Sequence, residues 1–144
     1  MNALGNVAAS ASKVRTIRVF VVEDSALIRE RLVRLLEGLS GVKVVGHAES
    51  ATDAIANIVS TQPDAVVLDI KLKAGSGIEV LRAIKHRMPE VAVIMLTNYA
   101  TEEYRQKCRQ EGAEYFLDKT NEFENLRPIF DWLNRNHLQG DPSC

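Results

Sequence analysis

The chain has few of the features that mark secreted, membrane-spanning or disulfide-bonded proteins. Cys108 and Cys144 are its only cysteines. Two cysteines cannot build a disulfide framework or a set of metal ligands, so we expect two unlinked thiols. The longest apolar runs, at residues 65–68 and 91–96, are too short to cross a bilayer, and nothing near Met1 has the pattern of a signal peptide. The sequence therefore predicts a cytoplasmic location and no membrane contact.

The chain also lacks an excess of charge of one sign. It has 18 basic and 19 acidic residues and a net charge of -1, so no overall field favours nucleic acid. Its 144 residues, 46% of them hydrophobic, are enough for one compact domain. We expect a disordered leader at residues 1–14, a folded domain at residues 15–138 and a polar tail at residues 139–144.

Short β-branched runs alternate with longer helical patterns along the domain. Strands are predicted at residues 17–22, 42–45, 65–68, 91–96 and 115–117. Helices are predicted at about 28–39, 52–60, 77–87 and 101–111, with a fifth from near Asn125. This alternation indicates an α/β fold, a doubly wound parallel sheet with helices on both faces. A strand order of 2-1-3-4-5 would place a ligand crevice at the carboxyl ends of strands one and three.

Two helical patterns have unusual residues. At residues 101–111 only Tyr104 and Cys108 form an apolar i, i+4 pair, so this helix is expected to be loosely held. In the last helix, Pro128 fits the first turn, where backbone N–H groups are free. Trp132 is expected to be partly exposed, either as packing at the edge of the core or as part of a partner surface.

Polar residues stand where the predicted strands end. In chain order these are Glu23, Asp24, Asp69, Thr97 and Lys119. Capping of the first helix by Asp24 or Ser25 is a simple alternative explanation for part of this pattern. However, two carboxylates about 4 Å apart repel by about 4 kcal/mol at an effective dielectric constant of about 20. A hard divalent cation such as Mg²⁺ would neutralise three carboxylates in one crevice.

Lys119 and Thr97 indicate the chemistry that such a metal would support. A lysine ammonium and a threonine hydroxyl are suitable partners for the oxygens of a phosphoryl group. Asp69 could then attack phosphorus while Mg²⁺ and Lys119 offset the charge on the other oxygens. The product would be a labile acyl phosphate on Asp69.

Residues from about 15 to 135 resemble the receiver domain of two-component response regulators. The matching segments are VFVVEDSALIRERL, DAVVLDI, GSGIEVL, VIMLTN and GAEYFLDK, in family order and spacing. The resemblance implies a flavodoxin-like fold with Asp69 as the phosphoacceptor. It also implies that Glu23, Asp24, Asp69 and the Lys71 carbonyl hold Mg²⁺, that Thr97 and Lys119 hold the phosphoryl oxygens, and that Thr97 and Phe116 form the switch.

The resemblance further implies the partners. A histidine kinase or phosphotransfer protein would supply the phosphoryl group, and an unidentified output protein or domain would receive the signal. Members of the family commonly pair through the face of the fourth helix, fifth strand and fifth helix, so the resemblance allows a homodimer. No enzymatic activity is expected beyond the chain's own phosphorylation and dephosphorylation.

The chain departs from the family pattern at four positions. Thr120 and Lys73 stand where the family commonly has proline, in the first case after a cis peptide bond. Lys71 and Tyr99 lie two positions beyond Asp69 and Thr97, where members vary. Their bulk is expected to control the access of water to the phosphorylated aspartate.

Two other function classes remain. A phosphohydrolase or phosphotransferase on a related sheet would also use an aspartate nucleophile and Mg²⁺, but such enzymes commonly have a second aspartate where this chain has Lys71. An interaction module that works without phosphorylation is the other alternative. The sequence does not distinguish a stand-alone regulator from a part of a longer protein.

Overall fold

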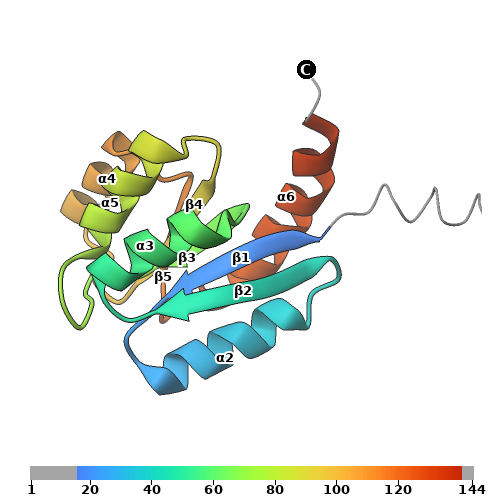
Figure 1. Cartoon of the computed structure of the whole chain (residues 1–144). Coiled ribbons are helices and arrows are strands. Elements are labelled where there is room, and N and C mark those ends of the chain that lie inside the picture. The colour runs from blue at the N-terminus through green and yellow to red at the C-terminus, as the bar shows by residue number, and fades with distance from the viewer. Residues whose placement is uncertain (1–15, 141–144) are drawn as a thin grey trace, which may run out of the picture.

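A computed structural model of the protein describes the backbone of residues 16–140 and the side chains of residues 16–136 (Figure 1). The elements are β1 (Ile17–Val22), α2 (Ala26–Glu37), β2 (Val42–Ala48), α3 (Ala51–Thr61), β3 (Ala65–Leu68), α4 (Gly77–Arg87), β4 (Ala92–Thr97), α5 (Glu102–Gln110), β5 (Tyr115–Asp118), a 3-10 turn η1 (Phe123–Asn125) and α6 (Leu126–Gly140). The five strands are parallel, in the order β2-β1-β3-β4-β5. The predicted fold class and strand order are confirmed.

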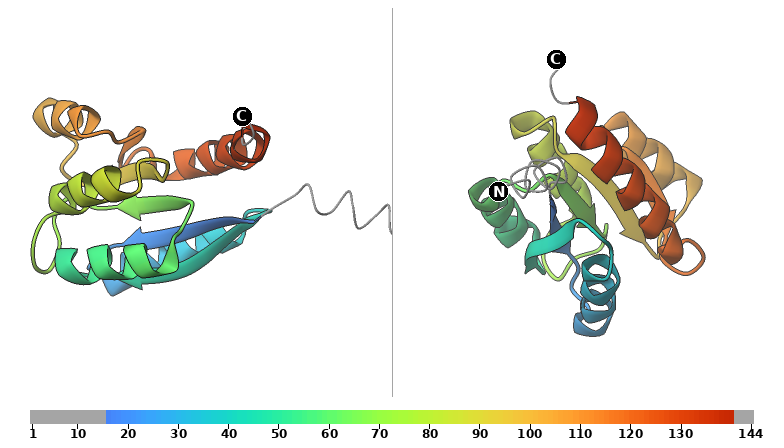
Figure 2. Two further views of the ribbon diagram at one scale, coloured as in Figure 1. Left: turned by 45° about the horizontal axis from the view of Figure 1, so that its top comes forward. Right: turned by 90° about the vertical axis from the view of Figure 1, so that its right-hand side faces the viewer.

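Helices cover both faces of the sheet (Figures 1 and 2). Successive side chains of each strand point to opposite faces, so both faces carry apolar side chains that must be buried. In β1, Phe20 and Val22 join the core cluster beneath α3, α4 and α5. Ile17 and Val21 join the other cluster, beneath α2 and α6. The strands therefore read as nearly continuous apolar runs in the sequence, as expected of a parallel sheet buried on both faces.

Four of the helices begin after a serine or threonine whose hydroxyl oxygen accepts a backbone N–H group. These N-caps are Ser25, Ser50, Ser76 and Thr101. Ser76 belongs to a capping box, in which the Glu79 carboxylate accepts the N–H of Ser76 in return, at 2.8 Å. The alternative of a helix cap beside the acidic pair is thus correct for Ser25, which accepts the N–H of Ile28 at 3.3 Å.

The largest error of the sequence prediction concerns β2, which continues to Ala48 and not only to residue 45. Its pairing with β1 shifts register between Val19 and Phe20, so the strand contains an irregularity that hides its period. Gly46 lies in this part of the strand, and a Cβ atom there would come within 2.8 Å of the Phe20 ring. The glycine interrupts the apolar pattern but is required for packing.

Other boundaries differ by at most two residues. The first predicted helix, at 28–39, is observed as α2 at Ala26–Glu37, and the fourth strand is shifted by one residue to Ala92–Thr97. The predicted leader, residues 1–14, lies outside the described residues, and so do residues 141–144 of the predicted tail. Residues 139 and 140 still belong to α6. Among the described residues, none of the helices has the combination of length and apolar character that a bilayer span requires.

Candidate functional site

The sheet places Glu23 and Asp69 side by side. Val22 and Leu68 are paired at the ends of β1 and β3, and each is followed by one of the two acids. The backbone N–H of Asp69 donates to the carbonyl of Val22 at 3.1 Å, which extends the ladder by one step beyond the strands. Because parallel strands end at the same edge, the two carboxylates meet there.

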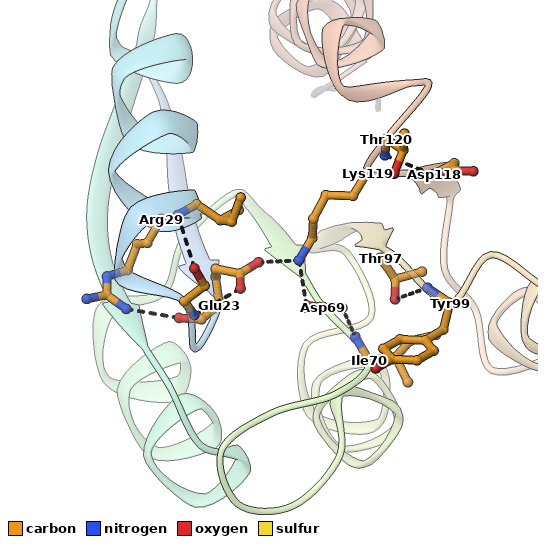
Figure 3. Close-up of polar contacts among 11 residues, drawn as sticks. Glu23, Arg29, Asp69, Ile70, Thr97, Tyr99, Asp118, Lys119 and Thr120 are labelled. Atoms are coloured by element: carbon orange, nitrogen blue, oxygen red, sulfur yellow. Dashed lines mark hydrogen bonds and ion pairs between the residues drawn. The ribbon is translucent and has the colours of Figure 1, made fainter.

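Lys119 joins both acids from the opposite side (Figure 3). It follows β5, and its backbone N–H donates to the carbonyl of Thr97 at 2.9 Å. Its ammonium nitrogen lies 2.7 Å from Glu23 Oε1 and 2.7 Å from Asp69 Oδ2. Glu23, Asp69 and Lys119 are 2%, 6% and 9% exposed, so this is a buried ionic cluster in which the charges must compensate one another.

Burial and hydrogen bonding act in opposite directions on the pKa values of Lys119 and Glu23. Burial by itself would lower the pKa of the Lys119 ammonium, but its hydrogen bonds to Asp69 and Glu23 outweigh burial and raise that pKa above its ordinary value. Burial raises the pKa of Glu23, against the opposing hydrogen bond from Lys119. The lysine is therefore firmly charged, whereas the negative charge on Glu23 is costly.

The acidic group has room for a cation. Oxygen atoms of Glu23, Asp24 and Asp69 all lie within 4.8 Å of one another, and Asp24 is exposed at the solvent side. Three carboxylates face one ammonium group here, so part of the negative charge is left uncompensated. All of the donors are oxygen atoms, which are the ligands that Mg²⁺ prefers. This arrangement fits a hard divalent cation.

Asp69 is held in one orientation from two sides. Its Oδ1 accepts the backbone N–H of Ile70 at 2.7 Å, and its Oδ2 accepts from Lys119. The backbone behind Asp69 is also tightly packed against the start of α4. A Cβ atom on Gly77 would lie 1.8 Å from the Asp69 carbonyl oxygen, so only glycine fits there. Gly75, two residues earlier, has a φ of 82°, a left-handed conformation that favours glycine.

Thr97, Tyr99 and Lys71 lie beside this cluster. Thr97 is fully buried at the end of β4, and its hydroxyl oxygen accepts the backbone N–H of Tyr99 at 3.0 Å. Lys71 lies in the loop after Asp69, with its ammonium nitrogen 5.2 Å from the centre of the Tyr99 ring. This cation–π contact joins the loop after β3 to the loop after β4.

Phe116 lies on β5, packed against the core cluster beneath α5 and only half-buried. The guanidinium carbon of Arg105, on α5, lies 4.7 Å from the centre of the Phe116 ring. Arg105 also donates to the Phe116 carbonyl oxygen at 3.3 Å. Phe116 thus contacts α5 and is separate from the ionic cluster of Glu23, Asp69 and Lys119.

The Lys119–Thr120 peptide bond is trans, since the described residues include no cis peptide. The N–H of Thr120 donates to the Asp118 side chain at 2.8 Å, and Glu122 accepts the N–H of Asp118 at 2.8 Å. These bonds hold the turn after β5, so Lys119 reaches the acids without a proline in the next position.

An ionic network that the sequence prediction missed joins three segments around the acidic group. Arg29, on α2, donates to the Glu23 carbonyl oxygen at 3.0 Å and to Glu49 at 3.2 Å. Glu49 also accepts from Lys73 at 3.2 Å, which ties the loop after Asp69 to the end of β2. Glu49 follows the true end of β2, but the predicted strand stopped at residue 45. A correct boundary would have added Glu49 to the polar residues at the strand ends.

Comparisons with known proteins agree with this geometry. Residues 19–131 match the family model described as the response regulator receiver domain. A DNA-binding transcriptional activator of Mycobacterium tuberculosis, DevR/DosR, is 36% identical over 103 residues, which are 72% of this chain and 48% of that protein. A protein-glutamate methylesterase/protein-glutamine glutaminase of Treponema denticola is 30% identical over 123 residues, 83% of this chain and 33% of that protein.

Solved structures agree as well. The response regulator domain of Thermotoga maritima CheB is 30% identical, with a TM-score of 0.76 over 89% of this chain and 100% of that chain. The receiver domain of a NarL regulator of Mycobacterium tuberculosis is 26% identical, with a TM-score of 0.77 over 84% and 98%. A doubly wound α/β domain with an acidic group at its crevice is thus the class of protein that fold and site define. This chain belongs to the response regulator receiver domain family of two-component systems. It spans about half or less of the length of these curated relatives.

Proposed function

We propose that this domain is a signalling switch that takes a phosphoryl group onto Asp69 from a histidine kinase or phosphotransfer protein. The observation that carries the proposal is the cluster in which Lys119 bonds both Glu23 and Asp69 beside the exposed Asp24. Asp69 and Glu23 each accept two hydrogen bonds. Asp69 is the proposed nucleophile because it follows the central strand β3 and because the resemblance to receiver domains gives it the acceptor position. Glu23, Asp24, Asp69 and the Lys71 carbonyl are the proposed Mg²⁺ ligands.

In the proposed reaction, a carboxylate oxygen of Asp69 forms a bond to phosphorus as the bond from phosphorus to the donor's imidazole nitrogen breaks. The imidazole leaves with the electron pair of that bond. Bound Mg²⁺ would supply positive charge for the phosphoryl oxygens. Lys119, already charged and 2.7 Å from Asp69, would offset the remaining negative charge and hold Asp69 in line.

Lys71 and Tyr99 are proposed to limit the access of water to the acyl phosphate. Their side chains meet across the loops that follow β3 and β4, at 5.2 Å. Hydrolysis needs a water molecule in line with the phosphorus–oxygen bond, and these two bulky groups stand beside that approach. The lifetime of the phosphorylated state would therefore depend on both residues.

The switch is proposed to run from Thr97 to Phe116 and α5. The Thr97 hydroxyl would leave the N–H of Tyr99 and donate to a phosphoryl oxygen, which vacates space and lets Phe116 turn inward. Phe116 contacts Arg105 of α5, and α5 has one buried residue, Cys108. An element held by so few contacts can change position at small cost in free energy. Phosphorylation would bias this equilibrium and alter the face of α5, β5 and α6 for an output partner.

The decisive experiment is intact mass spectrometry after incubation with acetyl phosphate and Mg²⁺. Native protein should gain the mass of one phosphoryl group, whereas Asp69→Asn, which keeps the shape of the side chain, should gain none. Asp53→Asn is a matched control on the exposed surface of α3 and should behave as the native protein. Equal modification of the native protein and Asp69→Asn would move the acceptor to another residue.

The remaining expectations from the sequence are part of the same proposal. These are a receiver domain at residues 15–138, a cytoplasmic location, no direct contact with nucleic acid or membrane, and no turnover of external substrates. A homodimer through α5, β5 and α6 is one assembly to test by mass in solution with and without beryllofluoride. Steady hydrolysis of small phosphate esters would instead favour the phosphohydrolase alternative.

A further inference from the structure

A second hollow lies at the opposite edge of the sheet from the acidic group. It has a volume of about 240 Å³, and Ile17, Ala65 and Ala92, the first residues of β1, β3 and β4, line it. Trp132 and Leu133 of α6 line another side. The hollow therefore lies between the amino ends of the strands and α6, where the proposed phosphorylation chemistry has no part.

The charged residues that line this hollow are all acidic. Asp64, Glu90 and Glu114 come from the segments that lead into β3, β4 and β5, and none of the lining residues in the described part of the chain is a lysine or arginine. Glu114 bonds Lys85 at 2.7 Å, so its charge is already compensated. Asp64 accepts the backbone N–H of Arg18 at 2.9 Å, and Glu90 is exposed. The hollow is thus lined by apolar residues and bordered by carboxylates.

Trp132 adds a flat aromatic surface to this rim. Its side chain is 49% exposed, although large hydrophobic residues in this fold are mostly buried. An indole face beside carboxylates suits a cation with an apolar stem, because the ring quadrupole and the acids attract the charge while the stem covers the ring. A lysine or arginine side chain has this chemistry.

We propose that the segment of residues 1–15 docks on the hollow, with the side chains of Lys13 and Arg15 against Trp132 and the acidic rim. The segment ends at the hollow itself, since Ile17 lines it. It contains Lys13 and Arg15 and no acidic residue, so its charge is complementary to the rim. Lys13 is four residues from Ile17, and an extended chain of that length reaches about 13 Å.

The direction of the Ile17 side chain supports the segment of residues 1–15 as the occupant. Ile17 points to the α6 side of the sheet, as part of the cluster beneath α2 and α6. In an extended chain, residues two and four positions before it point to the same side. Arg15 and Lys13 stand two and four positions before Ile17 in the sequence.

Trp132 is the only tryptophan of the chain, so its fluorescence tests the proposal directly in the full-length protein. Replacing Lys13 and Arg15 together by glutamate should expel the segment from the acidic rim. We expect a red-shifted emission maximum and a roughly twofold higher acrylamide quenching constant. The control replaces Lys43 and Arg87, which are exposed and do not line the hollow, by glutamate, and should leave both readings unchanged.

Adding Glu90→Lys to the double variant restores opposite charges across the rim and should partly reverse both changes. Equal emission and quenching in the native protein and the double variant would overturn the proposal. So would an equal change in the control, because net charge and not this segment would then be responsible. Native emission that varies with protein concentration, together with a dimer mass in light scattering, would assign the hollow to a second copy.

Discussion

The helices α4 and α5, which precede and follow β4 in the chain, are held in very different ways. In α4, Gly77, Val80, Leu81 and Ile84 are buried, the helix begins in a capping box, and its first residue packs on the Asp69 carbonyl. In α5, Cys108 is the one buried residue and Tyr104 packs against the core while partly exposed. Ion pairs and the stacking of Arg105 on Phe116 add further contacts. The segment after Asp69 is thus backed by a fixed element, whereas the segment after Thr97 leads into a weakly held one.

This difference would suit the proposed switch, in which Asp69 stays in place while the face of α5, β5 and α6 moves. Packed apolar side chains resist small displacements, since lost contacts are not replaced. Ion pairs at an exposed surface can reform elsewhere at little cost. The four predictions below test whether the contrast between α4 and α5 is as large as the packing indicates.

Gly77→Ala should have the largest effect. The new Cβ atom would lie 1.8 Å from the Asp69 carbonyl oxygen, and both groups belong to the backbone, so the start of α4 or the loop must shift. We expect a loss of about 4 kcal/mol in the free energy of unfolding, or no folded protein. Urea denaturation followed by circular dichroism measures it. Gly38→Ala, whose Cβ would meet nothing closer than 3.4 Å, is the control and should change stability by less than about 1 kcal/mol.

Truncation of one buried side chain in each helix compares their anchoring directly. Ile84→Ala in α4 should cost about 2–5 kcal/mol, because it leaves a cavity in a dense core. Cys108→Ala in α5 removes only one sulfur atom and should cost about 1 kcal/mol. Hydrogen exchange should show that Cys108→Ala lowers protection mainly at the backbone amides of α5. Equal losses, spread over the whole domain, would mean that α5 is anchored as firmly as α4.

The Cys108 thiol predicts a dependence of stability on alkaline pH. Burial raises the pKa of this thiol from 9.0 to about 11. The unfolded thiol loses its proton near pH 9 and the folded thiol only near 11, so the folded state binds more protons in this window and stability falls as pH rises. The expected loss is on the order of 2 kcal/mol. Lys119, whose pKa is also raised, adds a loss at still higher pH.

Urea denaturation of the native protein and Cys108→Ala from pH 8 to 11 separates the contributions of Cys108 and Lys119 to the pH dependence of stability. The variant should keep its stability between pH 9 and about 10, where Lys119 is still charged in both states, and the native protein should not. Parallel curves for the two proteins would show that the thiol is not shielded by α5.

The smallest effect is expected for the ion pair that joins the two helices. Arg82 of α4 bonds Glu111, at the end of α5, at 3.2 Å, and the arginine side chain is 53% exposed. Arg82→Gln should lower the melting temperature only slightly, and salt should reduce even that effect. Thermal unfolding at low and high salt is the measurement, with Arg87→Gln, exposed on the same helix, as the control. A larger cost would make this pair a true link between α4 and α5.

Much of the fold follows from local patterns. The bounds predicted for α4, 77–87, are those observed, because the capping serine, the apolar period and the following proline all act within a few residues. β2 was predicted too short, because the need for a glycine at position 46 arises only from its contact with the Phe20 ring of β1. The same error hid Glu49 and its bonds to Arg29 and Lys73.

The sequence alone determined which polar residues meet at the carboxyl edge of the sheet, because parallel strands end at the same edge. These residues are Glu23, Asp24, Asp69, Thr97 and Lys119. Only the tertiary structure decided how the charges pair, with Lys119 between Glu23 and Asp69, because the position of a long side chain depends on packing from several elements at once. It also decided where Trp132 lies. An indole on α6 lines the same hollow as the first residues of three strands only after the sheet has formed, and no local pattern contains that arrangement.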